Sequence, residues 1–237
     1  MLEWFREEVD QRGALLALRN LVSILWQFVR ESMPDRRRQR YGDVDYDWDR
    51  RVDTTSATVG WRDRLLGLLY SPYQPTDPAL FHEMMSKLEI DFGQFVFIDI
   101  GSGKGRVLLM AADYPFRRIV GVELLPELHR IAQENIKKYK SESQKCFAVE
   151  STCGDARDFV FPPEPMVIYL FNPLPETGFI KLLAKLEGSL DQNPRPVYVL
   201  YHNPLLEHVM SVASWVRKIS GTHQYSVFST RPHLYNE

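Results

Sequence analysis

The fold is decided by residues 97–106, FIDIGSGKGR, where a short apolar run passes directly into a glycine-rich turn. An apolar run of this length before a glycine is typical of a buried strand. Glycine accepts positive φ and lets the backbone approach a ligand closely. The sequence therefore predicts a strand over residues 95–100 and a helix from about Lys104 to Ala112, with a ligand-binding turn between them.

Strands and helices are predicted to alternate on the C-terminal side of this turn. Further strands are expected over residues 118–122, 145–152, 166–171, 197–202, 215–219 and 224–230. Helices are expected over residues 126–139 and 176–190, with a short one after the strand at 197–202. This alternation predicts an α/β fold, a doubly wound, Rossmann-like and mostly parallel sheet of seven strands. The last two strands have no helix between them and are expected to form an antiparallel edge.

Residues 1–60 are expected to form an extension to a domain over residues 61–237. From about Leu2 to Glu31 the spacing predicts one long amphipathic helix with a wide apolar face. The domain or a second subunit covers that face in one interpretation, and a membrane surface covers it in another. The apolar stretch is too short and too interrupted by polar residues to span a bilayer.

A polar linker is predicted between this helix and the domain. The basic run Arg36–Arg40 is followed by aspartates at positions 43, 45, 47 and 49, which largely cancel its charge. A short helix is expected over residues 62–70. Asp77 is expected to cap the next helix, which has Pro78 at its first position.

The composition favours an ordinary globular protein of the cytoplasm. The formal net charge of -2 gives no overall electrostatic reason to expect a nucleic-acid partner. The two cysteines, Cys146 and Cys153, lack the spacing of a metal or redox motif and are expected to be reduced thiols. The first residues lack the charged head of a secretory signal.

Two acids distinguish between three nucleotide-binding arrangements. A phosphate-binding loop would need glycine at position 98 and Ser or Thr after Lys104, and neither is present. A dinucleotide fold needs the spacing Gly-x-Gly-x-x-Gly, whereas the glycines here are at 101, 103 and 105. Asp99 would repel a pyrophosphate but suits the cationic amino group of a methionine moiety. Glu123, at the end of the next strand, is placed to accept hydrogen bonds from ribose hydroxyls.

The pattern Asp99-x-Gly101-x-Gly103-x-Gly105 with Glu123 resembles the cofactor site of class I, seven-strand S-adenosylmethionine-dependent methyltransferases. The resemblance extends from about residue 70 to the C-terminus. It implies that Asp99 and the backbone at the first two glycines hold the methionine end of S-adenosyl-L-methionine, and that Glu123 holds the ribose. The further cofactor contacts that it implies are Asp155, at the adenine amino group, and Ser102, Leu124, Ala156 and Thr76.

Asn172-Pro173, at the end of the fourth strand, resembles the Asn-Pro-Pro-aromatic motif of enzymes that methylate amino or amide nitrogen. By that resemblance, the Asn172 side chain and the following carbonyl accept hydrogen bonds from the target nitrogen and orient it toward the methyl group. Leu174 and Pro175 depart from the motif. A plain chain turn therefore stays open as the other interpretation.

Tyr73-Gln74-Pro75-Thr76 resembles the Tyr-x-Pro-Thr segment of certain seven-strand protein-lysine methyltransferases. The resemblance implies a protein lysine as acceptor, with Tyr73 at the cofactor carboxylate or the acceptor channel and Thr76 close by. An ordinary transition from loop to helix is the alternative. His202, on the same rim, is either a base with a pKa near neutrality or a structural residue.

The leading hypothesis is methyl transfer to nitrogen on a protein side chain. A second hypothesis keeps the cofactor but makes the acceptor a nucleic-acid base or a small amine. A third is a non-catalytic module that binds the cofactor and acts through its N-terminal helix. Under each of the three hypotheses, that helix is available for contact with a membrane surface or with a second copy of the chain.

Overall fold

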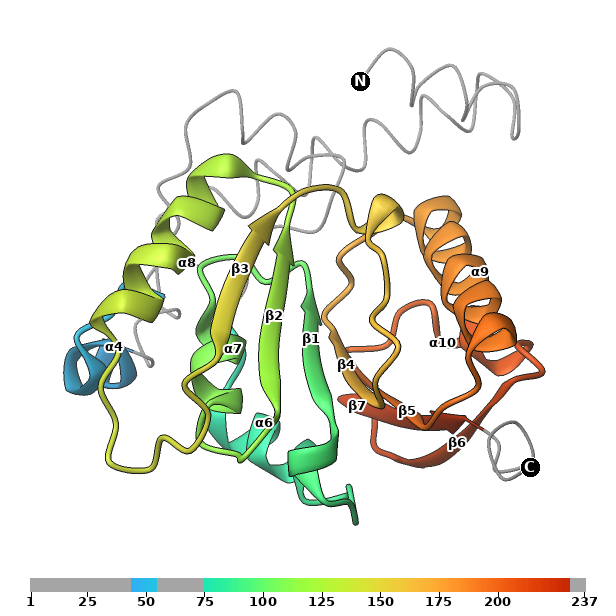
Figure 1. Cartoon of the computed structure of the whole chain (residues 1–237), viewed down its shortest axis with the longest axis horizontal. Coiled ribbons are helices and arrows are strands. Elements are labelled where there is room, and N and C mark those ends of the chain that lie inside the picture. Colours follow the sequence, from blue (N-terminus) through green and yellow to red (C-terminus); the bar gives the residue numbers. More distant parts are fainter. Residues whose placement is uncertain (1–43, 55–74, 231–237) are drawn as a thin grey trace.

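A seven-stranded sheet lies between two layers of helices in the computed structural model, which describes residues 44–54 and 75–230 (Figure 1). The strands are β1 (Val96–Ile100), β2 (Arg118–Glu123), β3 (Val149–Cys153), β4 (Met166–Leu170), β5 (Val197–His202), β6 (Val216–Gly221) and β7 (Tyr225–Thr230). Their order across the sheet is β3-β2-β1-β4-β5-β7-β6. The first five are parallel, and β7 runs antiparallel to both β5 and β6. The predicted fold class is confirmed, including the antiparallel edge.

The helices divide between the two faces of the sheet. One face is covered by α6 (Pro78–Met85), α7 (Arg106–Ala111) and α8 (Pro126–Lys138). The other is covered by α9 (Glu176–Gln192), the short α10 (Glu207–Ser211) and the 3-10 turn η3 (Ala156–Asp158). A second 3-10 turn, η2 (Phe92–Gln94), leads into β1. Because the chain crosses from β3 at one end of the sheet to β4 beside β1, the carboxyl ends of β1 and β4 form a switch point where ligands of such sheets bind.

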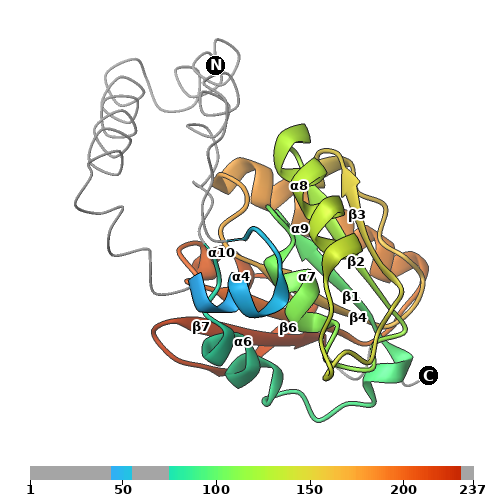
Figure 2. The same cartoon turned by 90° about the vertical axis from the view of Figure 1, so that its left-hand side faces the viewer.

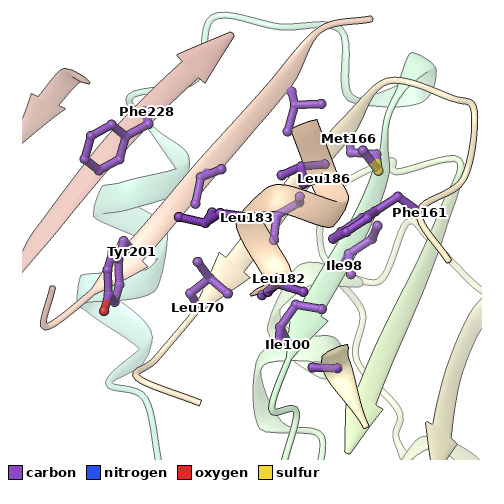
Figure 3. Close-up of a cluster of buried hydrophobic side chains, with 14 of the residues drawn as sticks. Ile98, Ile100, Phe161, Met166, Leu170, Leu182, Leu183, Leu186, Tyr201 and Phe228 are labelled. Carbon is purple, nitrogen blue, oxygen red and sulfur yellow. The ribbon is translucent and has the colours of Figure 1, made fainter. Parts of the chain in front are cut away.

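Two apolar cores follow from the alternation of side chains along the strands. Ile98 and Ile100 of β1 point toward α9, into the core drawn in Figure 3. Phe97, between them in sequence, points toward α6 and α7. Asp99 shares that second face, so one carboxylate is carried by a strand on which every residue is buried. The strand pattern thus delivers an acid to the side of the sheet where α7 begins.

Asp77 caps α6 as the sequence predicts. Its carboxylate accepts a hydrogen bond from the backbone N–H of Leu80 at 3.0 Å, and Pro78 occupies the first helical position. The cap fixes the start of α6, and the capping residue directly follows Thr76.

Two predictions differ from the structure by more than two residues. The third strand begins at Val149 rather than at Lys145, because the N–H groups of Lys145 and Cys146 both donate to the carbonyl of Ala112 after α7. Part of the predicted polar linker is the helix α4 (Val44–Arg50), drawn in blue in Figure 2. Its Tyr46 is buried. The predicted helices at 2–31 and 62–70 lie outside the described residues, as does Tyr73.

None of the helices in the described part of the chain combines the length and apolar composition that crossing a bilayer requires.

Phe81 is a test of the core between α6 and the sheet. It is fully buried, with edge-to-face ring contacts to Phe97 at 6.1 Å and Tyr169 at 6.0 Å between centroids. We expect Phe81→Ala to lower the free energy of unfolding by about 3–5 kcal/mol in urea denaturation. The control is Phe147→Ala, because Phe147 is 79% exposed and its truncation should change stability by less than ~0.5 kcal/mol. Equal effects of the two substitutions would contradict this assignment of the core.

Candidate functional site at the carboxyl ends of β1, β2 and β4

The glycine turn after β1 is folded back against β2. The N–H groups of Gly101 and Ser102 both donate to the carbonyl of Val122, at 2.8 and 3.0 Å, and the N–H of Gly105 donates to the carbonyl of Ser102 at 2.8 Å. The φ angles of Gly101, Gly103 and Gly105 are +82°, +54° and +83°. Residues with a Cβ rarely adopt such angles, which explains the alternate spacing of the three glycines.

Close packing also demands glycine at two points around the turn. A Cβ on Gly101 would lie 2.7 Å from the Cβ of Pro173, and one on Gly121 would lie 2.7 Å from the hydroxyl of Ser102. The turn is therefore held between the end of β2 and the turn that follows β4. Pro173, a predicted catalytic residue, packs against the glycine turn at Gly101.

Asp99 and Glu123 are both buried at this edge, with 2% and 6% of their surfaces exposed. Burial raises the pKa of Asp99 well above its ordinary value, and the nearby charge of Glu123 raises it further. Burial also raises the pKa of Glu123, although backbone N–H donors oppose the shift. The Glu123 carboxylate accepts from Gly103 at 2.7 Å and from Leu125 at 2.8 Å. The acid thus holds the middle of the turn.

This donor set suits a ligand with one cationic and several hydroxyl groups. A buried carboxylate with a raised pKa is stabilised in its charged form by an ammonium group nearby. Gly101 leaves the backbone of the turn exposed, and among the described residues the buried hydroxyl of Ser102 has no hydrogen-bond partner. Leu124, predicted beside Glu123, is half-buried at the same rim. The predicted residues from 99 to 124 are therefore brought together.

Asp155 is engaged by a neighbour that the sequence analysis missed. It caps η3, accepting from the backbone N–H of Arg157 at 2.8 Å and from its guanidinium at 2.6 Å. These hydrogen bonds lower the pKa of Asp155. Ala156 is buried in the core beside α9. The spacing Asp155-x-Arg157 in the sequence could have indicated this ion pair. The pair favours the charged form of the carboxylate, at the outer end of the site.

Asn172 holds two strand ends together. Its amide nitrogen donates to the carbonyl of Asn203 at 2.7 Å, and its oxygen accepts from the hydroxyl of Tyr201 at 2.9 Å. Its φ of +45° is one that asparagine tolerates better than most residues. Because an amide oxygen has two lone pairs, the bond from Tyr201 leaves one for another donor.

A buried chain of hydroxyls connects Thr76 to His202. The Tyr169 hydroxyl lies 2.8 Å from the Thr76 hydroxyl and 2.8 Å from Nδ1 of His202. The imidazole stacks on Phe171, with centroids 3.9 Å apart. Burial lowers the pKa of His202 to about 4, so the ring is neutral at pH 7 and is a weak base. Tyr169 was missed, although it is the register partner of Asp99 on β4.

Residues 71–157 match the family described as histone methylation protein DOT1. A protein-lysine N-methyltransferase of Saccharolobus islandicus (strain REY15A) is 35% identical over 68 residues, which span 28% of this chain and 42% of that relative. The chain thus matches less than half the length of this relative. The family match covers the glycine turn, Glu123 and Asp155, and it confirms the resemblance to seven-strand methyltransferases.

Solved structures with a similar fold include an RNA methyltransferase from Salinibacter ruber in complex with S-adenosyl-L-homocysteine. It is 22% identical with a TM-score of 0.43, over 66% of this chain and 92% of that one. A ribosomal protein L11 methylase from Lactobacillus delbrueckii subsp. bulgaricus is 11% identical with a TM-score of 0.45, over 63% of this chain and 75% of that one. What these structures share with the chain is the arrangement of strands and helices.

The raised pKa of Asp99 predicts a pH-dependent gain in stability on neutralisation. The folded state holds this proton more tightly than the unfolded chain, whose pKa is near 3.8, so ionisation destabilises the fold as pH rises. We expect Asp99→Asn to unfold at a higher temperature than the unaltered chain at pH 8, and the difference to shrink toward pH 4. Thermal melts across that range measure it. Asp191→Asn, on the exposed end of α9, is the control and should show no such trend. A difference for Asp99→Asn that is independent of pH would show that the carboxylate is not strained by burial.

Proposed function

We propose that this chain is a methyltransferase that uses S-adenosyl-L-methionine and delivers the methyl group to an amino nitrogen of a protein side chain, lysine in the first place. One observation carries the proposal: two buried carboxylates, Asp99 and Glu123, meet a turn of three positive-φ glycines at the carboxyl ends of adjacent parallel strands. The family match over residues 71–157 and the lysine-methylating relative support the same activity.

Each acid has a distinct role in binding. The Asp99 carboxylate, on the α7 face of β1, accepts the ammonium of the methionine moiety, which relieves the cost of its buried charge. The Glu123 carboxylate faces the ribose hydroxyls while it keeps Gly103 in place. Thr76, Ser102 and Leu124 border the cofactor, and Asp155 with Ala156 lies at the adenine end.

The bound cofactor supplies a methyl group on a sulfonium, and the products are the methylated amine and S-adenosyl-L-homocysteine. The nitrogen lone pair forms the new bond to carbon as the carbon–sulfur bond breaks. Asn172 orients the incoming amine through the free lone pair of its amide oxygen, and Pro173 keeps that turn against Gly101. The proton lost from the product amine passes to solvent.

Cofactor binding is tested by calorimetry with S-adenosyl-L-homocysteine. We expect Asp99→Asn to weaken binding at least a hundredfold, because the ammonium loses its charge partner, while the variant stays folded. Asp191→Asn should bind as the unaltered chain does. Undiminished affinity in Asp99→Asn would remove this acid from the site, and absence of binding by the unaltered chain would refute the proposed cofactor.

Turnover tests the role of Asn172. We expect Asn172→Ala to keep its affinity for S-adenosyl-L-homocysteine and to lose at least tenfold in kcat, about 1.4 kcal/mol of barrier. The substrate is fractionated lysate with methyl-labelled cofactor, and label in protein, nucleic acid or small molecules identifies the acceptor class. Asn193→Ala, beyond the end of α9, is the matched control. An unchanged kcat would exclude Asn172 from the reaction, and label confined to nucleic acid would refute the protein acceptor.

A further inference from the structure

Residues 44–54, here called the strap, are fastened to the cofactor turn from outside the sheet (Figure 2). Asn135 on α8 brackets the backbone of Asp53: its oxygen accepts from the N–H, and its nitrogen donates to the carbonyl, both at 2.9 Å. The same nitrogen lies 3.0 Å from the carbonyl of Lys104. One buried amide therefore joins the strap to the glycine turn.

The second fastening is an ion pair. Lys104 stands between Gly103 and Gly105 and is 1% exposed. Its ammonium lies 2.7 Å from the Asp53 carboxylate. Because removing a charged group from water costs several kcal/mol, a buried lysine needs a carboxylate at this distance. The charge in the middle of the turn is thus paired with a residue that lies 51 positions earlier in the chain.

The strap is itself a closed structure that presents Asp53. The N–H of Thr54 donates to the Asp47 carboxylate at 2.7 Å, the Thr54 hydroxyl donates to the same carboxylate, and the N–H of Val52 donates to the Asp47 carbonyl at 3.0 Å. The buried ring of Tyr46 lies 4.3 Å below the guanidinium of Arg106, the first residue of α7. The strap therefore meets both the turn and the helix that follows it.

We propose that Asp53 is a positioning residue of the cofactor site, which holds Lys104 so that the turn over residues 101–105 keeps its ligand-binding geometry. The inference rests on the proposed function. It adds a segment that precedes the residues matched by the family.

The physical argument is that the turn is anchored from two sides. On the β2 side, Glu123 accepts a hydrogen bond from the N–H of Gly103. On the strap side, Asp53 pairs with the Lys104 ammonium, and Asn135 donates to the Lys104 carbonyl. When the Asp53 charge is removed, the buried ammonium loses a charge partner at 2.7 Å, which favours its movement away from the strap. Gly103 and Gly105 move with it, because they adjoin Lys104 in the chain. The backbone of the turn over residues 101–105 then loses its fixed geometry.

The full chain with Asp53→Asn tests the proposal against Asp49→Asn, which makes the same change at an exposed position of the strap. We expect Asp53→Asn to bind S-adenosyl-L-homocysteine about tenfold more weakly by calorimetry, and Asp49→Asn to bind unchanged. Hydrogen exchange of the amides at residues 103–106 should accelerate in the first variant alone. Unchanged affinity together with unchanged exchange in Asp53→Asn would overturn the proposal, even if its melting temperature falls.

Lys104→Met separates the ion pair from the fold of the strap. In the Lys104→Met background, adding Asp53→Asn should change the affinity less than twofold, because the charge that Asp53 holds is gone. A full tenfold loss there would show that Asp53 acts by another route. If the unaltered chain binds no S-adenosyl-L-homocysteine, the proposed function fails. The exchange measurement, which needs no ligand, then still decides whether Asp53 orders the turn.

Discussion

Two carboxylates buried side by side at the edge of a parallel sheet are the constraint on which the rest of the site depends. Burial raises the pKa of both Asp99 and Glu123, and the charge of Glu123 raises the pKa of Asp99 further. Glu123 is offset by N–H donors, one of which comes from Gly103. Gly103 supplies this donor with a φ of +54°, an angle that glycine adopts more readily than other residues. Asp99 is left as the group whose charge a cationic ligand would stabilise most.

The three strand ends around this pair behave as one unit. A Cβ on Gly101 would lie 2.7 Å from the Cβ of Pro173, and one on Gly121 would lie 2.7 Å from the Ser102 hydroxyl, so these strand ends are closely packed. Asn172 extends the unit to the end of β5 through its bond to the carbonyl of Asn203. The glycine turn and the turn after β4, to which the proposed function assigns the cofactor and the acceptor, therefore share their packing. Substitutions in the two turns are expected to combine non-additively for that reason.

Local sequence patterns predicted the sheet and the glycine turn. They did not predict contacts between residues far apart in the sequence. The apolar run ending in Asp99 and the alternate glycines predicted the turn, since each glycine is required by a backbone angle at its own position. The strap was interpreted as a polar linker because its alternating aspartates look solvated. Its burial depends on Tyr46 meeting Arg106, 60 positions later, and no local period records such a pair. Tyr169 was missed for the same reason, because it looks like one more apolar residue of a buried strand.

At the rim proposed for the acceptor, the described part of the chain places the uncharged side chains of Thr76, Tyr169 and His202. The Tyr169 phenol, whose pKa is raised by burial, lies between a threonine hydroxyl and a neutral imidazole. The phenol has one O–H donor, so it donates to one of these two groups and accepts from the other. The three side chains thus form a fixed chain of hydrogen bonds. A histidine with a pKa of about 4 would not retain a proton taken from an alkylammonium. In the proposed reaction His202 is therefore not the group that deprotonates the amine. Thr76, Tyr169 and His202 contribute rigidity. Their hydrogen bonds join the residues that precede α6 to strands β4 and β5, beside Asp99.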